Sequence, residues 1–177
     1  MLSLGSDWSV YWPHVASEVA AEAAVIRAAH DQGIPVFGIC YGNQIMAHAL
    51  GGTVERAREP EIGWYEVVSD LPEVIAPGPW FQWHSDVVTV PGGAEELARS
   101  AVGPQAWRMG RSMCTQFHPE VTEAIVRRWI EGGGAEEAQK FGRDPQAMLE
   151  ETRRNVADAK PNTNTLVDWF VESVAKA

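Results

Sequence analysis

The spacing of apolar residues changes along the chain, and each spacing predicts a different element. Apolar side chains recur at intervals of three or four over residues 15–32, which predicts a helix. A short apolar run over 36–39 follows and is typical of a buried strand. A second helix is expected over 42–50, where Gly51 and Gly52 end it. Helix, short loop, buried strand and helix in this order predict an α/β fold with a mostly parallel central sheet.

The middle of the chain reads as short strands joined by polar or Gly- and Pro-containing turns. Candidate strands cover residues 53–57, 65–69, 80–83, 87–90, 97–101, 105–109 and 112–117. The last of these form an antiparallel run, so a small antiparallel subsheet is expected. Helices are then expected over residues 121–131, up to 141, 145–159 and 165–175. Together these elements predict one domain over residues 1–177.

The amino-acid composition argues against several classes of function. The chain has 14 Lys plus Arg against 24 Asp plus Glu, which argues against nucleic acid as a partner. Its 2 cysteines do not make a disulfide framework. Neither a signal peptide pattern nor an apolar run long enough to cross a bilayer is visible, so no membrane partner is expected. These features predict a cytoplasmic, reducing setting.

Cys40 lies where the predicted strand meets the predicted helix. Gly38 and Gly42 stand two residues to either side, as in the sharp turn that exposes a nucleophile above a sheet. The N-terminus of a helix also favours a thiolate. A lone cysteine among apolar neighbours is otherwise typical of a core residue, so this assignment depends on a second motif.

The second motif is Gln116-Phe117-His118-Pro119-Glu120. On an extended backbone, His118 and Glu120 leave the same side, so the carboxylate can orient the imidazole. A cysteine, a histidine and an acid together are the parts of a nucleophilic triad.

These two motifs resemble those of the class I, or triad, glutamine amidotransferases. The resemblance also covers Leu4-Gly5-Ser6, Glu61-Ile62-Gly63-Trp64 and His84-Ser85-Asp86. It implies a flavodoxin-like fold and the catalytic residues Cys40, His118 and Glu120. It also implies that the reaction needs no metal and no organic cofactor.

The resemblance further implies an oxyanion hole made by the backbone N–H groups of Gly5 and Tyr41. Contacts to the substrate glutamine are expected from Gln44, His84, Ser85 and Asp86. The last three residues are predicted to form a turn between two strands. The alternative for Asp86 is a turn residue that bonds its own backbone.

The activity implied is hydrolysis of the side-chain amide of glutamine through a cysteinyl thioester. The products are glutamate and ammonia, and the ammonia would serve a separate synthetase or other acceptor enzyme. Two alternatives stay open. One is a hydrolase of γ-glutamyl amides or peptides with the same triad, and the other is an inactive binding or regulatory module.

Family members normally have a strand, a helix and a further strand before the segment that residues 2–5 match. Their absence predicts a sheet edge with unpaired backbone groups. The explanations are a start codon assigned too late, a shortened chain, or a native short form whose edge is covered by another protomer. The third explanation would make the protein a homo-oligomer.

Overall fold

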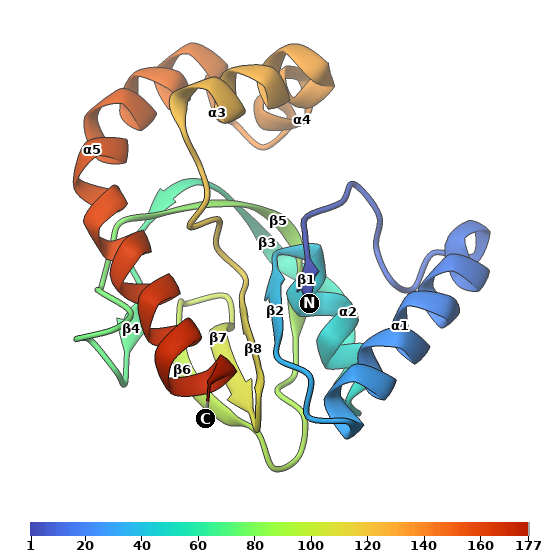
Figure 1. Ribbon diagram of the computed structural model, residues 1–177. Helices are drawn as coiled ribbons and strands as arrows, with labels where there is room; N and C mark the ends of the chain where they lie inside the picture. The colour runs from blue at the N-terminus through green and yellow to red at the C-terminus, as the bar shows by residue number, and fades with distance from the viewer. Residues whose placement is uncertain (177) are drawn as a thin grey trace.

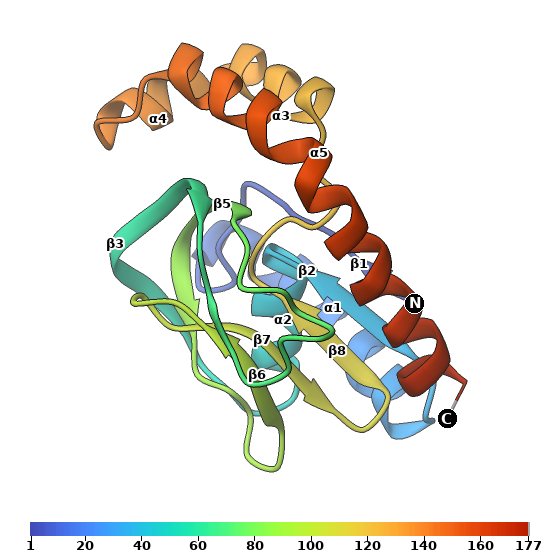
Figure 2. The ribbon, with the colours of Figure 1, turned by 90° about the vertical axis from the view of Figure 1, so that its left-hand side faces the viewer.

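The computed structural model describes residues 1–176, and secondary structure is stacked in three layers (Figure 1, Figure 2). The central six-stranded sheet consists of β1 (Leu2–Ser3), β2 (Val36–Ile39), β4 (Val68–Ser69), β6 (Glu95–Arg99), β7 (Pro104–Met109) and β8 (Ser112–Thr115). A separate two-stranded sheet pairs β3 (Val54–Tyr65) with β5 (Trp80–Val88).

The helices are η1 (Pro13–Val15), α1 (Ala16–Asp31), α2 (Tyr41–Ala49), α3 (Glu123–Trp129), the π-helical turn η2 (Ile130–Gly134), α4 (Ala135–Lys140), α5 (Pro145–Trp169) and η3 (Phe170–Ala175). Helices α1 and α2 lie on one face of the sheet and α5 on the other, while α3 and α4 lie beyond the end of the strands (Figure 1). Within residues 1–176, none of these helices combines the length and apolarity that a membrane span requires.

The central sheet has the order β1-β2-β8-β7-β6-β4. Strands β1, β2 and β8 are parallel, and β7, β6 and β4 join them in antiparallel pairs. The predicted α/β class, with a central sheet and a small antiparallel sheet, is confirmed. The parallel trio brings the carboxyl ends of β2 and β8 to the same edge, where a site is expected in such sheets.

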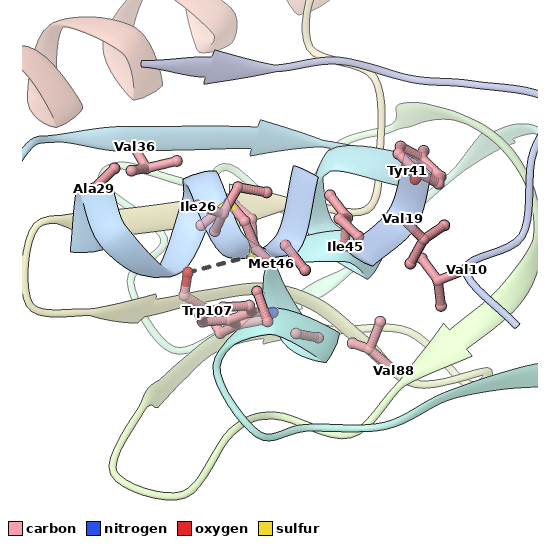
Figure 3. Close-up of a cluster of buried hydrophobic side chains, with 14 of the residues drawn as sticks. Val10, Val19, Ile26, Ala29, Val36, Tyr41, Ile45, Met46, Val88 and Trp107 are labelled. Atoms are coloured by element: carbon pink, nitrogen blue, oxygen red, sulfur yellow. Dashed lines mark hydrogen bonds between the residues drawn. The ribbon is translucent and has the colours of Figure 1, made fainter. Parts of the chain in front are cut away.

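The core is divided by the sheet because neighbouring residues of a strand point to opposite faces. On β2, Val36 packs into a cluster with α1 and α2, whereas Phe37 and Ile39 pack on the side of α5. Figure 3 shows the first cluster, in which Ile26 and Ile45 of the two helices face the sheet. Burial on both faces explains why β2 reads as a continuous apolar run.

Two predicted connectors are strand instead. Residues 58–61 continue β3, with irregular pairing between Arg56 and Glu61. The predicted turn at His84-Ser85-Asp86 was also wrong, because these residues lie inside β5 and pair with β3. Their polar side chains suggested a turn, but partners elsewhere in the fold satisfy them.

The predicted break near residue 160 was wrong as well, since α5 runs through Pro161. Proline has no N–H for the preceding turn, so the helix loses one internal hydrogen bond there. The helix continues because Leu166, beyond the proline, is fully buried against the sheet. Val174, near the end of the described chain, is also buried.

Strand β1 forms one edge of the described sheet and pairs with β2 through Leu2 and Ser3. Leu2 and Leu4 are 58% and 54% exposed at this edge. An exposed apolar edge is a surface on which another strand can pair. A homo-oligomer, which is one of the three explanations for the missing N-terminal elements, would cover this edge, and that interpretation stays a prediction.

Asn43 links α2 to the central sheet through a buried network of hydrogen bonds. Its amide nitrogen donates to Gln116 Oε1 at 2.8 Å. Its amide oxygen accepts from Trp107 Nε1 at 2.7 Å and from Cys114 Sγ at 3.0 Å. Because Gln116 is the first residue of the second motif, two residues before His118, this network also fixes the start of that motif.

We therefore expect Asn43→Ala to lower the free energy of unfolding by about 2 to 4 kcal/mol, because buried polar groups lose their partners. Urea denaturation measures this change. Asn164 is exposed, so Asn164→Ala should change the same quantity by less than about 0.5 kcal/mol. Equal effects of the two substitutions would contradict the role given to Asn43.

Candidate active site

The backbone at Cys40 is the most unusual in the chain. Its φ is 56° and its ψ is −106°, and among residues 1–176 no other non-glycine residue has a positive φ. Cys40 follows β2 directly and caps α2. Strained conformations of this kind persist at functional sites when the surrounding fold enforces them. The predicted elbow is therefore present.

Both glycines beside Cys40 are required by space. A Cβ on Gly42 would lie 2.2 Å from the carbonyl oxygen of Ser3, and a Cβ on Gly38 would lie 2.4 Å from Met46 Sδ. Backbone atoms of β1 leave no room at Gly42. The two glycines thus allow β1, β2 and α2 to meet closely enough to form the elbow.

His118 and Glu120 follow the end of β8 and form an ion pair. His118 Nδ1 lies 2.7 Å from Glu120 Oε1, and the imidazole is almost completely buried. The backbone N–H of His118 donates to the carbonyl of Phe81 at 2.8 Å. The hydroxyl of Thr163 on α5 donates to the carbonyl of Pro119 at 2.7 Å. The small sheet, through Phe81, and α5, through Thr163, therefore both hold the segment that carries His118.

Cys40 and His118 form a charged pair. Burial lowers the pKa of His118, but the charge of the Cys40 thiolate, a hydrogen bond to it and the contact with Glu120 together raise that pKa to about 10. The imidazole is therefore a cation at neutral pH. Within residues 1–176 no group of three or more His, Cys, Asp or Glu side chains is arranged to hold a metal.

Gly5 lies against the side chains of Cys40 and His118. A Cβ at this position would be 3.3 Å from His118 Cε1 and 3.8 Å from Cys40 Cβ. Tyr41 is the first residue of α2, so its backbone N–H has no acceptor within the helix. The phenol of Tyr41 is buried instead, and burial with the nearby Glu22 raises its pKa to about 12.

Four residues were expected to contact the substrate, and they occupy different environments. Gln44 is buried on α2 one turn after Cys40, and its N–H bonds the Cys40 carbonyl at 3.2 Å. His84 is held inside the strand pair, with Nε2 3.1 Å from Glu61 Oε2 and Nδ1 3.0 Å from the carbonyl of Asp86. Ser85, the neighbour of His84, is only half-buried.

Asp86 is used by the fold itself. Its two carboxylate oxygens accept hydrogen bonds from Ser9 Oγ at 2.5 Å and Tyr11 OH at 2.7 Å. These bonds tie the loop after β1 to β5. Asp86 thus anchors the loop that also contains Gly5, rather than bonding its own backbone as a turn residue would.

Comparison with known proteins places this arrangement in a family. The model of the class-I glutamine amidotransferase family matches residues 13–126. The chain belongs to the class I glutamine amidotransferases. It is 34% identical over 161 residues to a glutamine-hydrolysing GMP synthase of Aquifex aeolicus, covering 81% of this chain and 32% of that protein.

A GMP synthase of Aeropyrum pernix is also 34% identical, over 72% of this chain and 27% of that protein. This amidotransferase chain thus spans about a third or less of the length of these relatives. Among solved structures, a glutamine amidotransferase from Thermotoga maritima matches with a TM-score of 0.86 and 30% identity, over 97% of this chain and 78% of that one. One from Methylobacillus flagellatus matches with a TM-score of 0.78 and 26% identity, over 96% and 74%.

Sequence reasoning missed several residues that support this amidotransferase site. Trp83 belongs to neither motif, yet its backbone carbonyl lies 3.7 Å from Cys40 Sγ. Trp129 contacts the imidazole of His118, and Thr163 holds the peptide between His118 and Glu120. No spacing rule connects these residues to the motifs, because the contacts arise only when distant elements pack.

The charged pair predicts that Cys40→Ala lowers the pKa of His118. The substitution removes the thiolate, and burial then opposes the charged imidazole more effectively. An NMR titration of the His118 ring measures the change. Cys114→Ser is the matched control, because Cys114 is fully buried in the core and burial raises the pKa of its thiol well above the usual value. An unchanged His118 titration in Cys40→Ala would exclude the pair.

The raised pKa of His118 also determines the direction in which the stability of the fold changes with pH. A group whose pKa rises from 6.5 to about 10 on folding contributes stability that is fully present below pH 6.5. This contribution is lost as the pH rises through the folded value. We expect the amidotransferase to lose stability between these limits in chemical denaturation, and Cys40→Ala to lose less over the same range.

Proposed function

We propose that this chain hydrolyses the side-chain amide of glutamine through a thioester on Cys40. The observation that carries the proposal is the charged pair of Cys40 and His118 on a strained elbow, with Glu120 bonded to the far nitrogen of the imidazole. A thiolate, an acid–base group and its orienting carboxylate are the parts that acyl transfer through sulfur requires. Membership of the amidotransferase family supports glutamine as the acyl donor.

In the first half of the reaction, the Cys40 thiolate attacks the amide carbon of glutamine. The carbonyl oxygen becomes an oxyanion, for which we assign the backbone N–H groups of Gly5 and Tyr41. His118 then gives its proton to the amide nitrogen. The carbon–nitrogen bond breaks, ammonia leaves, and a γ-glutamyl thioester remains on the sulfur.

In the second half, neutral His118 takes a proton from water. The resulting hydroxide attacks the thioester carbon, and the sulfur leaves as a thiolate beside the regenerated imidazolium. The product is glutamate. Glu120 stays an anion throughout and keeps the imidazole in one orientation, because Nδ1 is bonded to it.

Recognition of glutamine is assigned to Gln44, His84 and Ser85. Gln44 lies one turn from the nucleophile, and Ser85 is half-buried on β5, two residues after Trp83. His84 acts by holding this strand to Glu61, since both its ring nitrogens lie at protein acceptors. For Asp86 we propose an indirect role through the loop of Gly5.

Ammonia released into water diffuses away unless an enzyme that consumes it lies near. Its relatives include GMP synthases described as glutamine-hydrolysing, which supports a separate synthetase or other ammonia-consuming enzyme as the partner of this chain. The chain spans about a third of those relatives.

The test is release of glutamate from glutamine by the purified chain. Cys40→Ala should abolish it, and His118→Ala should lower kcat by roughly a hundredfold to ten-thousandfold because acid–base catalysis is lost. Cys114→Ser should retain activity close to the parent, since Cys114 is buried in the core cluster of α1 and α2 and a serine hydroxyl can keep its hydrogen bond to Asn43.

Two results would each indicate one of the alternative functions instead. Turnover of γ-glutamyl amines faster than glutamine, still lost in Cys40→Ala, would indicate the γ-glutamyl hydrolase with the same triad. A folded chain whose Cys40 is not protected by glutamine and forms no thioester would indicate the non-catalytic binding module.

A further inference from the structure

The imidazole of His118 has a neighbour that the triad does not explain. Trp129 ends α3, and its ring lies edge-on to the His118 ring with 4.8 Å between centroids and 64° between planes. Glu120 bonds one ring nitrogen, Cys40 bonds the imidazole as well, and Gly5 lies beside Cε1. Trp129 therefore completes an enclosure around a ring that must stay aligned with the sulfur.

Trp129 is itself held in place by Trp83. The two indoles meet edge to face, with 6.0 Å between centroids and 89° between planes. Trp83 Nε1 donates to Glu137 Oε2 on α4 at 2.9 Å. The backbone carbonyl of Trp83 lies 3.7 Å from Cys40 Sγ, so one residue links Cys40 to the helices after the triad.

We propose that Trp129 is a positioning residue that fixes the imidazole of His118 toward Cys40, and that the contact of Gly134 with Trp83 holds Trp129 in place. The inference rests on the proposed pairing of Cys40 with His118. It adds that residues 129–134 set the alignment of that pair, although they follow the triad in sequence. Rotation of a catalytic base away from its nucleophile is costly, because small misplacements of reacting groups lower rates steeply.

The glycines of η2 provide a way to move Trp129 without changing it. A Cβ on Gly134 would lie 2.6 Å from Trp83 Cζ2 and 2.7 Å from the carbonyl oxygen of Trp129. Gly134 has an ordinary helical φ of −65°, so alanine there would act through this clash and not through backbone strain. A Cβ on Gly132, two residues earlier, would meet nothing within 4 Å.

The experiment compares four variants of the full chain: Trp129→Ala, Trp129→Phe, Gly134→Ala and Gly132→Ala. The first measurement is the rate of Cys40 alkylation by iodoacetamide at neutral pH, with the labelled cysteine identified by mass spectrometry. This rate reports the thiolate held by His118 and does not require glutamine turnover. The second measurement is kcat and KM for glutamate release, and circular dichroism checks folding.

We expect Trp129→Ala and Gly134→Ala to lower both the alkylation rate and kcat by roughly tenfold, with KM changed by less than about twofold. Trp129→Phe, which keeps an aromatic edge, and Gly132→Ala should stay close to the parent. Where Trp129→Ala fails to fold, the two glycine variants decide the question.

Parent-like alkylation and kcat in folded Gly134→Ala would overturn the proposal, as would an equal loss in Gly132→Ala. A loss of stability in Trp129→Ala with unchanged alkylation would show packing only. If the parent is alkylated at Cys40 but does not hydrolyse glutamine, the proposed function fails while the alkylation comparison still tests the positioning role.

Discussion

The contact between Gly42 and the carbonyl of Ser3 sets the distance between α2 and β1, and the catalytic end of the sheet is built on that distance. A side chain at Gly42 would meet this oxygen at 2.2 Å. Because α2 and β1 approach this closely, β1 ends beside the elbow. Gly5, which follows β1, therefore lies next to both Cys40 and His118. The strained φ of Cys40 follows from the same constraint, since the chain must turn from strand to helix without an intervening loop.

The opposite side of the site is held by other layers of the molecule. Strand β5 supplies the carbonyls of Phe81 and Trp83, which accept from His118 N–H and Cys40 Sγ. Helix α5 supplies Thr163, which holds the peptide between the histidine and the glutamate. Cys40 thus follows a strand of the parallel trio, while the segment that carries His118 is held by β5 of the small sheet and by the long helix α5.

The sequence predicted those parts of the site whose reason is local. Glycines at fixed offsets around Cys40 and the alternation of His118 with Glu120 need only a strand and a turn to be understood. Residues 84–86 were not predicted to be strand. The hydrogen-bond donors of the Asp86 carboxylate, Ser9 and Tyr11, lie more than 70 residues away in the chain and are not visible as a local pattern. Likewise, α5 passes through Pro161 because burial of Leu166 outweighs one missing hydrogen bond.

Strands β1, β2 and β8 pair in parallel although long stretches of chain separate them, with Leu2 opposite Phe37 and Phe37 opposite Met113. Parallel pairings between distant segments form late in folding, because the intervening chain must be ordered before the contacts are made. On the ribosome, the segment with Cys40 emerges long before the segment with His118. A half-synthesised chain therefore carries Cys40 without His118, and the two side chains meet only when the last strand of the trio docks.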